Sequence, residues 1–258
     1  MGVVNVTPDS FFDGGAHFAP ADAVATAQRM MRDGAAIVDI GGESTRPGSE
    51  GTSADEELRR LIPVLERLDD DVPVSIDTAK ADVAWQALAL GAEMVNDVTA
   101  LRGDPRMAEV AADEGAYLCL MHMQGEPRTM QVNPTYEDVV SDVARFLDER
   151  LAFAVSQGVR EELICLDPGI GFGKTVEQNF ELIRRLDELT AFGRPVLVGF
   201  SRKSSLGRVL GDRDAKTGRL SASLAAAVSA YERGATIIRA HDVRETVDAL
   251  TVARAVVG

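Results

Sequence analysis

The chain has 258 residues, of which 45% are apolar, and a formal net charge of -14 at pH 7. This length and apolar content suit a single domain over residues 1–258 with one buried core. The acidic balance excludes a nucleic-acid partner, because binding to a phosphate backbone needs a basic face. No apolar run approaches the roughly 18 residues of a membrane span, and Met1 leads directly into a strand-like run without a signal peptide. We therefore expect a cytoplasmic protein that contacts no membrane.

Eight short apolar runs, rich in Val and Ile, are typical of parallel strands that are covered on both faces. In chain order they are residues 2–6, 36–40, 72–76, 93–95, 117–121, 163–166, 195–199 and 236–238. Helical patterns between them include residues 21–32, 53–68, 80–90 and 136–157. Gly34, Gly91 and Gly158 follow three of these patterns and indicate helix C-caps. Ser53 and Glu56 have the spacing of a capping box at the start of another.

A strand recurs roughly every 33 residues, a spacing expected of βαβ units. The sequence therefore predicts an α/β fold, a single (β/α)8 TIM barrel. A doubly wound sheet fits less well, because the segment after the first strand lacks the glycines of a dinucleotide fingerprint. In a barrel the carboxyl ends of all strands meet at one mouth, where active sites lie. Polar residues that end the apolar runs should converge there, namely Asn5, Asp39, Asp77, Asn96, His122, Asp167, Ser201 and the pair Arg239 and His241.

Two loops after strands, residues 7–15 and 41–48, combine glycines with Phe, Asp, Thr and Arg side chains. Such loops often close over a bound substrate and exclude water. Taken alone, either loop is better explained as an ordinary glycine-rich turn.

Asp77, Asn96 and Asp167 end three strands, and Lys203 follows a fourth. Carboxylates and amides of this kind suit the donor-rich edge of an aminopyrimidine-like ring. A single Asp after a strand serves as often to cap the next helix, so the functional interpretation depends on the whole set.

Arg239 and His241 lie two positions apart on an extended segment, so their side chains should share a face and present two cations to a phosphate group. The run GFGKT at residues 171–175 lacks the spacing of a P-loop. No cluster of Cys and His residues indicates a tight metal site, whereas a loosely held Mg2+ shared with substrate phosphates is compatible with the chain. Cys119 and Cys165 lie inside strand-like runs and are expected to be buried free thiols.

Eight ordered motifs give the chain its resemblance to the dihydropteroate synthase family over essentially its whole length. They are NVTPDSF at 5–11, DIGGESTRPG at 39–48, SIDT at 75–78, VND at 95–97, MH at 121–122, LDPGIGF at 166–172, SRKS at 201–204 and RAHD at 239–242. The resemblance implies a transferase that joins dihydropterin methyl pyrophosphate to p-aminobenzoate and releases pyrophosphate. It also implies that the bond to pyrophosphate breaks largely before the amine attacks, which leaves a pterin-methyl cation.

The resemblance assigns residues to four groups. It implies a pterin site of Asp77, Asn96, Met121, Asp167 and Lys203. It implies that Asn5, Arg239 and His241 hold the pyrophosphate, with Asn5 also contacting Mg2+. It implies a p-aminobenzoate pocket of Phe11, Thr45, Pro47, Phe172 and Ser204. Within these loops and strand ends it implies catalytic roles for Asp13, Thr45, Arg46, Lys203, Arg239 and His241.

One position departs from the family pattern, because Ser205 stands where a bulky aromatic residue usually follows the SRKS motif. This leaves open whether the enzyme is an ordinary sulfonamide target or a sulfonamide-tolerant variant. The resemblance also implies a homodimer. Two other interpretations remain open: a pterin-binding methyltransferase domain, which would not need the STRPG and SRKS segments, and a non-catalytic pterin-binding paralogue.

Overall fold

The computed structural model describes residues 1–7, 20–44, 51–126 and 128–257. Its strands are β1 (Gly2–Asn5), β2 (Val38–Gly41), β3 (Val74–Asp77), β4 (Met94–Asp97), β5 (Tyr117–Met121), β6 (Ile164–Asp167), β7 (Leu197–Val198) and β8 (Ile237–Ile238). The helices that follow β1 to β5 are α1 (Pro20–Arg32), α2 (Ala54–Leu65), α3 (Ala81–Ala89), α4 (Met107–Asp113) and α5 (Val139–Ser156), before the 3-10 turn η1 (Glu161–Leu163). The later helices are α6 (Val176–Arg184), α7 (Asp187–Thr190), α8 (Ser204–Val209), α9 (Leu220–Tyr231) and α10 (Val243–Val257).

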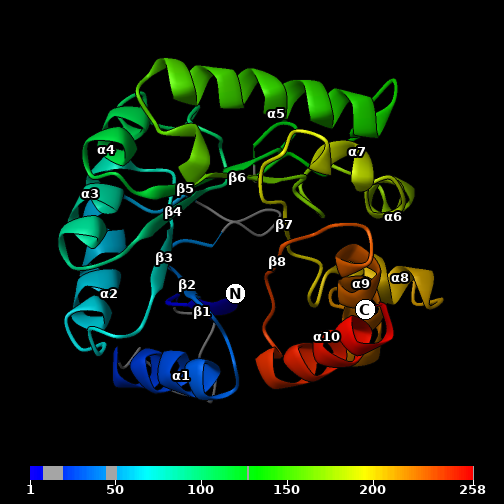
Figure 1. The fold of residues 1–258 in the computed structure, drawn as a ribbon, viewed down its shortest axis with the longest axis horizontal. Helices are drawn as coiled ribbons and strands as arrows, with labels where there is room; N and C mark the ends of the chain where they lie inside the picture. The colour runs from blue at the N-terminus through cyan, green and yellow to red at the C-terminus, as the bar shows by residue number, and fades with distance from the viewer. Residues whose placement is uncertain (8–19, 45–50, 127, 258) are drawn as a thin grey trace.

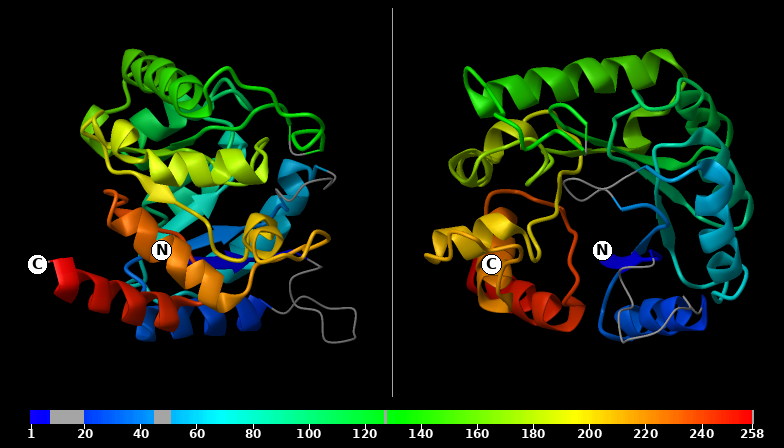
Figure 2. Two further views of the ribbon diagram at one scale, coloured as in Figure 1. Left: turned by 90° about the vertical axis from the view of Figure 1, so that its right-hand side faces the viewer. Right: turned by 180° about the vertical axis from the view of Figure 1, so that it is seen from behind.

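The strands close into a ring. Strands β1 to β6 form one parallel sheet in chain order, and β7 pairs in parallel with β8. Single bridges between Leu166 and Val196 and between Gly2 and Ala240 join the two sheets. Figure 1 shows the strands at the centre and the helices around them, and Figure 2 shows the same arrangement from the side and from behind. The predicted (β/α)8 barrel is confirmed.

The predicted helix ends are confirmed, but one predicted cap is only half formed. Gly34, Gly91 and Gly158 have positive φ angles of 99°, 98° and 94°, the backbone conformation that favours glycine. The Ser53 hydroxyl accepts a hydrogen bond from the Glu56 amide at 3.3 Å. The Glu56 carboxylate instead binds two arginines of its own helix, because a charged donor attracts it more strongly than a backbone amide does.

Two apolar layers alternate along each strand. Leu118 and Leu120 pack outward against the helices, whereas Cys119 between them faces the barrel interior with Met94 and Cys165. Cys119 and Cys165 are neighbours in the register of β5 and β6, and both are buried free thiols, as predicted. This alternation determines which residues at the strand ends face into the barrel.

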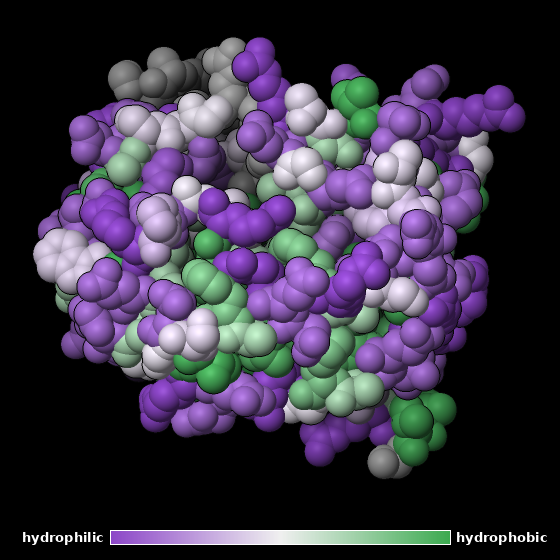
Figure 3. All heavy atoms as spheres, turned by 90° about the horizontal axis from the view of Figure 1, so that it is seen from above, coloured by the Kyte–Doolittle hydropathy of each residue, from purple (hydrophilic) through white to green (hydrophobic). Residues whose placement is uncertain are grey.

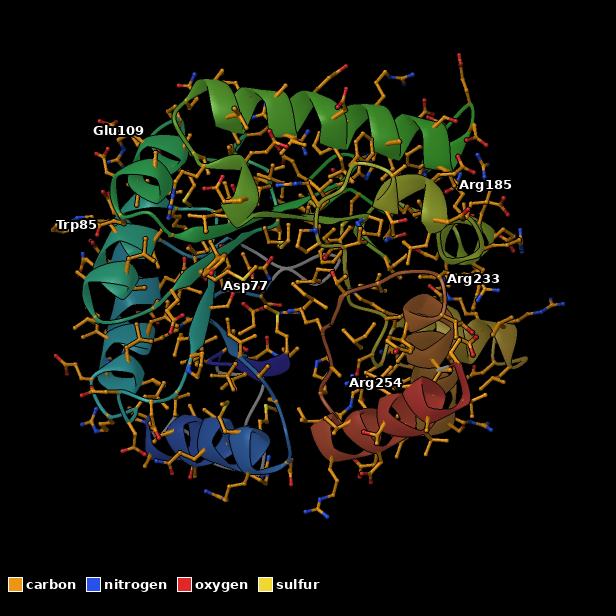
Figure 4. The ribbon with its side chains drawn as sticks, viewed as in Figure 1. Asp77, Trp85, Glu109, Arg185, Arg233 and Arg254 are labelled. Atoms are coloured by element: carbon orange, nitrogen blue, oxygen red, sulfur yellow. The ribbon has the colours of Figure 1, made fainter. Side chains whose placement is uncertain are left out.

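The outer face of the barrel that Figure 3 shows is mainly polar. In Figure 3 hydrophilic residues dominate the face seen from above, and hydrophobic residues occur there in small groups. Trp85 and Glu109 project outward from their helices in Figure 4. Within the described ranges, no helix combines the length and the apolar character that crossing a membrane requires.

Candidate active site

Polar side chains form a layer inside the barrel above its apolar interior. Cys165 faces inward, so Asp167, two positions later on β6, also faces inward, and the same relation connects Met94 to Asn96. Figure 4 shows Asp77 inside the ring of strands. By the same alternation, the inward layer contains Asn5, Asp39, Asp77, Asn96, Met121, Asp167 and Arg239.

Arg239 is the centre of this layer. Its guanidinium donates from Nε to Asp39 Oδ2 at 2.6 Å and from Nη2 to Asp77 Oδ2 at 3.0 Å. Asp39 also accepts from the Ser75 hydroxyl at 2.7 Å and from Asn96 Nδ2 at 3.0 Å. Asp39 lies inside β2 and not at its end, so it supports the layer from below while Asp77 and Asn96 lie at the strand ends.

Two acceptors of this layer have no hydrogen-bond partner among the described residues. They are Asp77 Oδ1 and Asn96 Oδ1, and both atoms are buried. Burial and the neighbouring Asp39 charge raise the pKa of Asp77 to about 7, against the opposing effect of Arg239. Burial likewise raises the pKa of Asp167 to about 6, although its carboxylate accepts the Gly169 amide at 2.7 Å. Buried acceptors without partners are costly, so this layer is suited to a ligand that presents N–H groups.

Lys203 and Phe172 meet at one side of this layer. The Lys203 ammonium lies 4.2 Å from the centre of the Phe172 ring, a cation–π distance. Ser204 follows Lys203 as the first residue of α8 and is partly exposed. The Lys203 cation and the Phe172 ring therefore form a wall suited to a small aromatic anion, next to the position of Ser204 in the chain.

His241 binds a different partner from Arg239. Its Nδ1 lies 3.1 Å from the Ser201 hydroxyl, and its backbone amide donates to the same oxygen at 3.2 Å. Burial, followed by the charges of Arg239 and Arg202, lowers the pKa of His241 to about 4. At pH 7 Arg239 is therefore a cation, whereas the His241 imidazole is neutral.

The structure also reveals a buried lysine that sequence reasoning set aside as part of a false P-loop. Lys174 is 2% exposed, and its ammonium lies 2.9 Å from His122 Nδ1. It also donates to the carbonyls of Phe172 at 2.9 Å and Gly169 at 3.0 Å. Because these acceptors enclose the ammonium, it is not available to a phosphate. The three glycines around it were the only local signal of a tightly folded loop.

Ser205 is buried, and its hydroxyl lies 3.2 Å from Asn179 Nδ2. Asn179 in turn accepts the Gly171 amide at 2.7 Å, so α8 is connected through α6 to the loop that carries Phe172. Ser205, the residue that departs from the family pattern, is therefore connected through Asn179 to the loop of Phe172 and lies next to Lys203 and Ser204 in the chain.

Several predicted site residues lie outside the described residues, namely Phe11, Asp13, Thr45, Arg46 and Pro47. Within residues 1–7, 20–44, 51–126 and 128–257, no three His, Cys, Asp or Glu side chains are grouped as metal ligands would be.

Comparison with known proteins shows the family to which this chain belongs. A family model described as "Pterin binding enzyme" matches residues 1–241, so the chain is a member of the pterin-binding enzymes. The dihydropteroate synthase of Escherichia coli K12 is 48% identical over 257 residues, which cover 99% of this chain and 90% of the relative. The chain belongs to the dihydropteroate synthase family.

Two solved structures share the fold throughout. Xanthomonas albilineans dihydropteroate synthase with 4-aminobenzoic acid has a TM-score of 0.92 and 47% identity, and the match covers 100% of this chain and 92% of that one. Yersinia pestis dihydropteroate synthase with a sulfonamide drug complex has a TM-score of 0.92 and 45% identity, and covers 99% of this chain and 92% of that one. The same barrel thus carries an arylamine or a related drug in these relatives.

Proposed function

We propose that this chain condenses 6-hydroxymethyl-7,8-dihydropterin pyrophosphate with p-aminobenzoate, giving 7,8-dihydropteroate and pyrophosphate, in folate biosynthesis. The observation that carries the proposal is the pair of buried acceptors without partners, Asp77 Oδ1 and Asn96 Oδ1. A dihydropterin presents an amino group and ring N–H groups along one edge, which would supply the donors that these atoms lack. Asp167 and Lys203 would complete the recognition of this edge, and Met121 would supply an apolar wall.

The charge distribution supports a dissociative reaction. As the bond to pyrophosphate breaks, positive charge develops on the pterin methylene group and is shared with the pterin ring, whose edge the carboxylates of Asp77 and Asp167 would contact. Carboxylates already oriented toward developing positive charge stabilise it without reorganisation. The arylamine nitrogen is nucleophilic in its neutral form, so the protein needs only to orient it toward the methylene carbon.

The leaving pyrophosphate requires positive charge and hydrogen-bond donors at the other side of the mouth. Arg239 has five N–H groups, of which the carboxylates of Asp39 and Asp77 take two among the described residues. Its remaining N–H groups, together with a hydrogen-bonding imidazole from His241, would hold the phosphate oxygens.

Magnesium fits this site as an ion that arrives with the pyrophosphate. Asn5 is partly exposed at the end of β1 and offers one amide oxygen. Mg2+ commonly keeps several waters and takes one or two protein ligands together with substrate phosphates. The donor set suits such a bridged ion and does not suit an all-protein cage. When bound, the ion would neutralise charge that accumulates on the departing pyrophosphate.

Phe172 and Ser204 would form the p-aminobenzoate subsite, and the Lys203 ammonium between them would attract the carboxylate. Because a sulfonamide resembles p-aminobenzoate in its aniline ring, we propose that the same subsite accepts sulfonamides. The roles implied for Phe11, Asp13, Thr45, Arg46 and Pro47 stay predictions, as do the homodimer and the cytoplasmic location.

The experiment that tests this function measures pyrophosphate release from the dihydropterin substrate with Mg2+, with and without p-aminobenzoate. Dihydropteroate should be detected in the same samples by chromatography. Pyrophosphate release coupled to dihydropteroate formation is the expected result. Retained pterin binding with no dihydropteroate would instead favour a methyltransferase domain or a non-catalytic paralogue.

A further inference from the structure

Lys174 is a buried amine whose direct hydrogen-bond partners are neutral. Burial lowers its pKa to about 7, against the opposing effect of the Asp167 charge. Three of its contacts are backbone carbonyl oxygens, from Gly169 at 3.0 Å, Phe172 at 2.9 Å and His122 at 3.4 Å. The fourth is the imidazole Nδ1 of His122 at 2.9 Å. A buried ammonium normally pairs with a carboxylate, so this arrangement needs a specific reason.

The reason lies in how closely two loops approach one another. A Cβ atom at Gly169 would lie 1.9 Å from the carbonyl oxygen of His122, and one at Gly173 would lie 2.5 Å from the carbonyl oxygen of Gln124. The loop after β6 therefore packs with its backbone against the segment after β5. Carbonyl oxygens directed at one point repel each other, and the N–H donors of Lys174 at that point offset this repulsion by hydrogen bonding to them.

The His122 side chain is suited to act as a neutral acceptor beside the three carbonyl oxygens that surround the Lys174 nitrogen. Burial, followed by the charge of Lys174, lowers the pKa of His122 to about 2. Its ring packs edge-on against Phe146 at a centroid distance of 4.8 Å, which fixes the direction of Nδ1. The imidazole is therefore neutral, and with its proton on Nε2 it accepts from Lys174 through Nδ1.

The loop after β6, whose carbonyls bind Lys174, carries side chains of the candidate active site at both ends. Asp167 lies at its start and accepts the Gly169 amide at 2.7 Å. Phe172 lies at its far end, where its carbonyl binds Lys174 and its ring contacts the Lys203 ammonium. Moving the Phe172 backbone would therefore move the wall next to Lys203, whereas Asp167 is additionally held by strand β6.

We propose that Lys174 is a positioning residue for the arylamine substrate, acting through the carbonyls of Gly169 and Phe172 to set the wall formed by Phe172 and Lys203. The inference rests on the proposed function, because it takes this wall as part of the p-aminobenzoate subsite. Lys174 itself touches neither substrate. Its loss should therefore weaken arylamine binding far more than pterin binding.

The test compares Lys174→Met, which keeps the chain length and removes the donors, with Lys216→Met at an exposed lysine. KM for p-aminobenzoate and for the pterin pyrophosphate would be measured, together with pterin affinity by calorimetry. In Lys174→Met, KM for p-aminobenzoate should rise roughly tenfold to a hundredfold, the effect of misplacing a wall by about 1 Å. Pterin affinity and the Lys216→Met variant should stay close to wild type.

A second variant keeps the inference testable if Lys174→Met does not fold. His122→Leu removes one acceptor and leaves the three carbonyls, so KM for p-aminobenzoate should rise by a smaller factor, and His122→Asn should partly restore it. Equal losses of pterin and arylamine binding, or unchanged KM values in folded variants, would overturn the positioning role.

Direct p-aminobenzoate binding to the pterin- and pyrophosphate-loaded protein separates this inference from the proposed function. A wild type that makes no dihydropteroate contradicts the function. Weaker arylamine binding in Lys174→Met would still support the positioning role in that case, and equal binding in both proteins would refute it.

Discussion

Replacing Arg239 with Met should destabilise the barrel through the two carboxylates that it leaves behind. Asp39 is fully buried and Asp77 is 9% exposed, and Arg239 donates one short hydrogen bond to each. Removing one partner from a buried ionic network typically costs about 3–5 kcal/mol, because the remaining charge is uncompensated. Asp39 would keep Ser75 and Asn96 as donors, whereas Asp77 would keep none that the described structure shows. We therefore expect a loss of about 3–5 kcal/mol in the free energy of unfolding at pH 7.

The pH dependence gives this prediction a second readout. The pKa of Asp77 is raised from 3.8 to about 7 in the folded protein, so the folded state binds more protons than the unfolded state between these values. Protonation of Asp77 therefore stabilises the folded protein at low pH, and this stabilisation is lost as the pH rises through the window from 3.8 to about 7. Without Arg239 the pKa of Asp77 should rise further. The stability difference between variant and wild type should therefore shrink from pH 7.5 to pH 5.

Urea denaturation followed by circular dichroism measures both effects. Arg254→Met is the matched control, since Arg254 is exposed on α10 and should change stability by at most about 0.5 kcal/mol. Adding Asp77→Asn to Arg239→Met should recover part of the loss, because it removes one of the unpaired charges. A loss below about 1 kcal/mol at pH 7, with an unchanged m-value, would refute the view that Arg239 neutralises this layer.

Three further outcomes follow from the described contacts. Gly169→Ala should destabilise the protein much more than Gly193→Ala in thermal denaturation. Both glycines have φ near +68°, but an added Cβ atom would clash with the His122 carbonyl oxygen only at Gly169, and at Gly193 it would meet nothing within 4 Å. The control should cost about 1–2 kcal/mol, and similar melting temperatures for the two would contradict the steric argument. Ser205→Phe should lower stability by about 1–3 kcal/mol, because Ser205 is buried against Asn179 and a ring must displace it. If stability and the affinities for p-aminobenzoate and a sulfonamide were all unchanged, Ser205 would have no role as a departure from the family's usual aromatic residue. Asp167→Asn should weaken pterin binding by about 1.5–3 kcal/mol in calorimetry, since it removes a charged acceptor, and an unchanged affinity would take Asp167 out of the pterin site.

Much of the site could be predicted because its signals are local. Asp77, Asn96 and Asp167 stand at the ends of apolar runs, and the alternation of side chains along a strand is a property of neighbouring residues. The positions of these residues could therefore be inferred once the strands were counted. The glycines at helix ends were predictable for the same reason, since a positive φ is required within one turn of the helix end.

Lys174 could not be identified in this way. Its role depends on carbonyls from two loops, and His122 lies 52 positions away in the chain. The sequence around it matched only an imperfect phosphate-binding pattern, and nothing local indicated that its ammonium would be enclosed. Glu56 differed from prediction for a local reason, because Arg59 and Arg60, three and four positions later, attract its carboxylate more strongly than the backbone amide at the helix start does.

The chain by itself determined the number of strands, their parallel arrangement, the family, and which strand ends carry polar residues. Only the tertiary structure decided the partners of those residues. Arg239 meets Asp39 across 200 positions of sequence because closing the barrel brings β8 next to β1, and Asp39 lies on the strand after that. Burial then determines their energetics, since charges removed from water depend on whichever groups the closed ring places beside them.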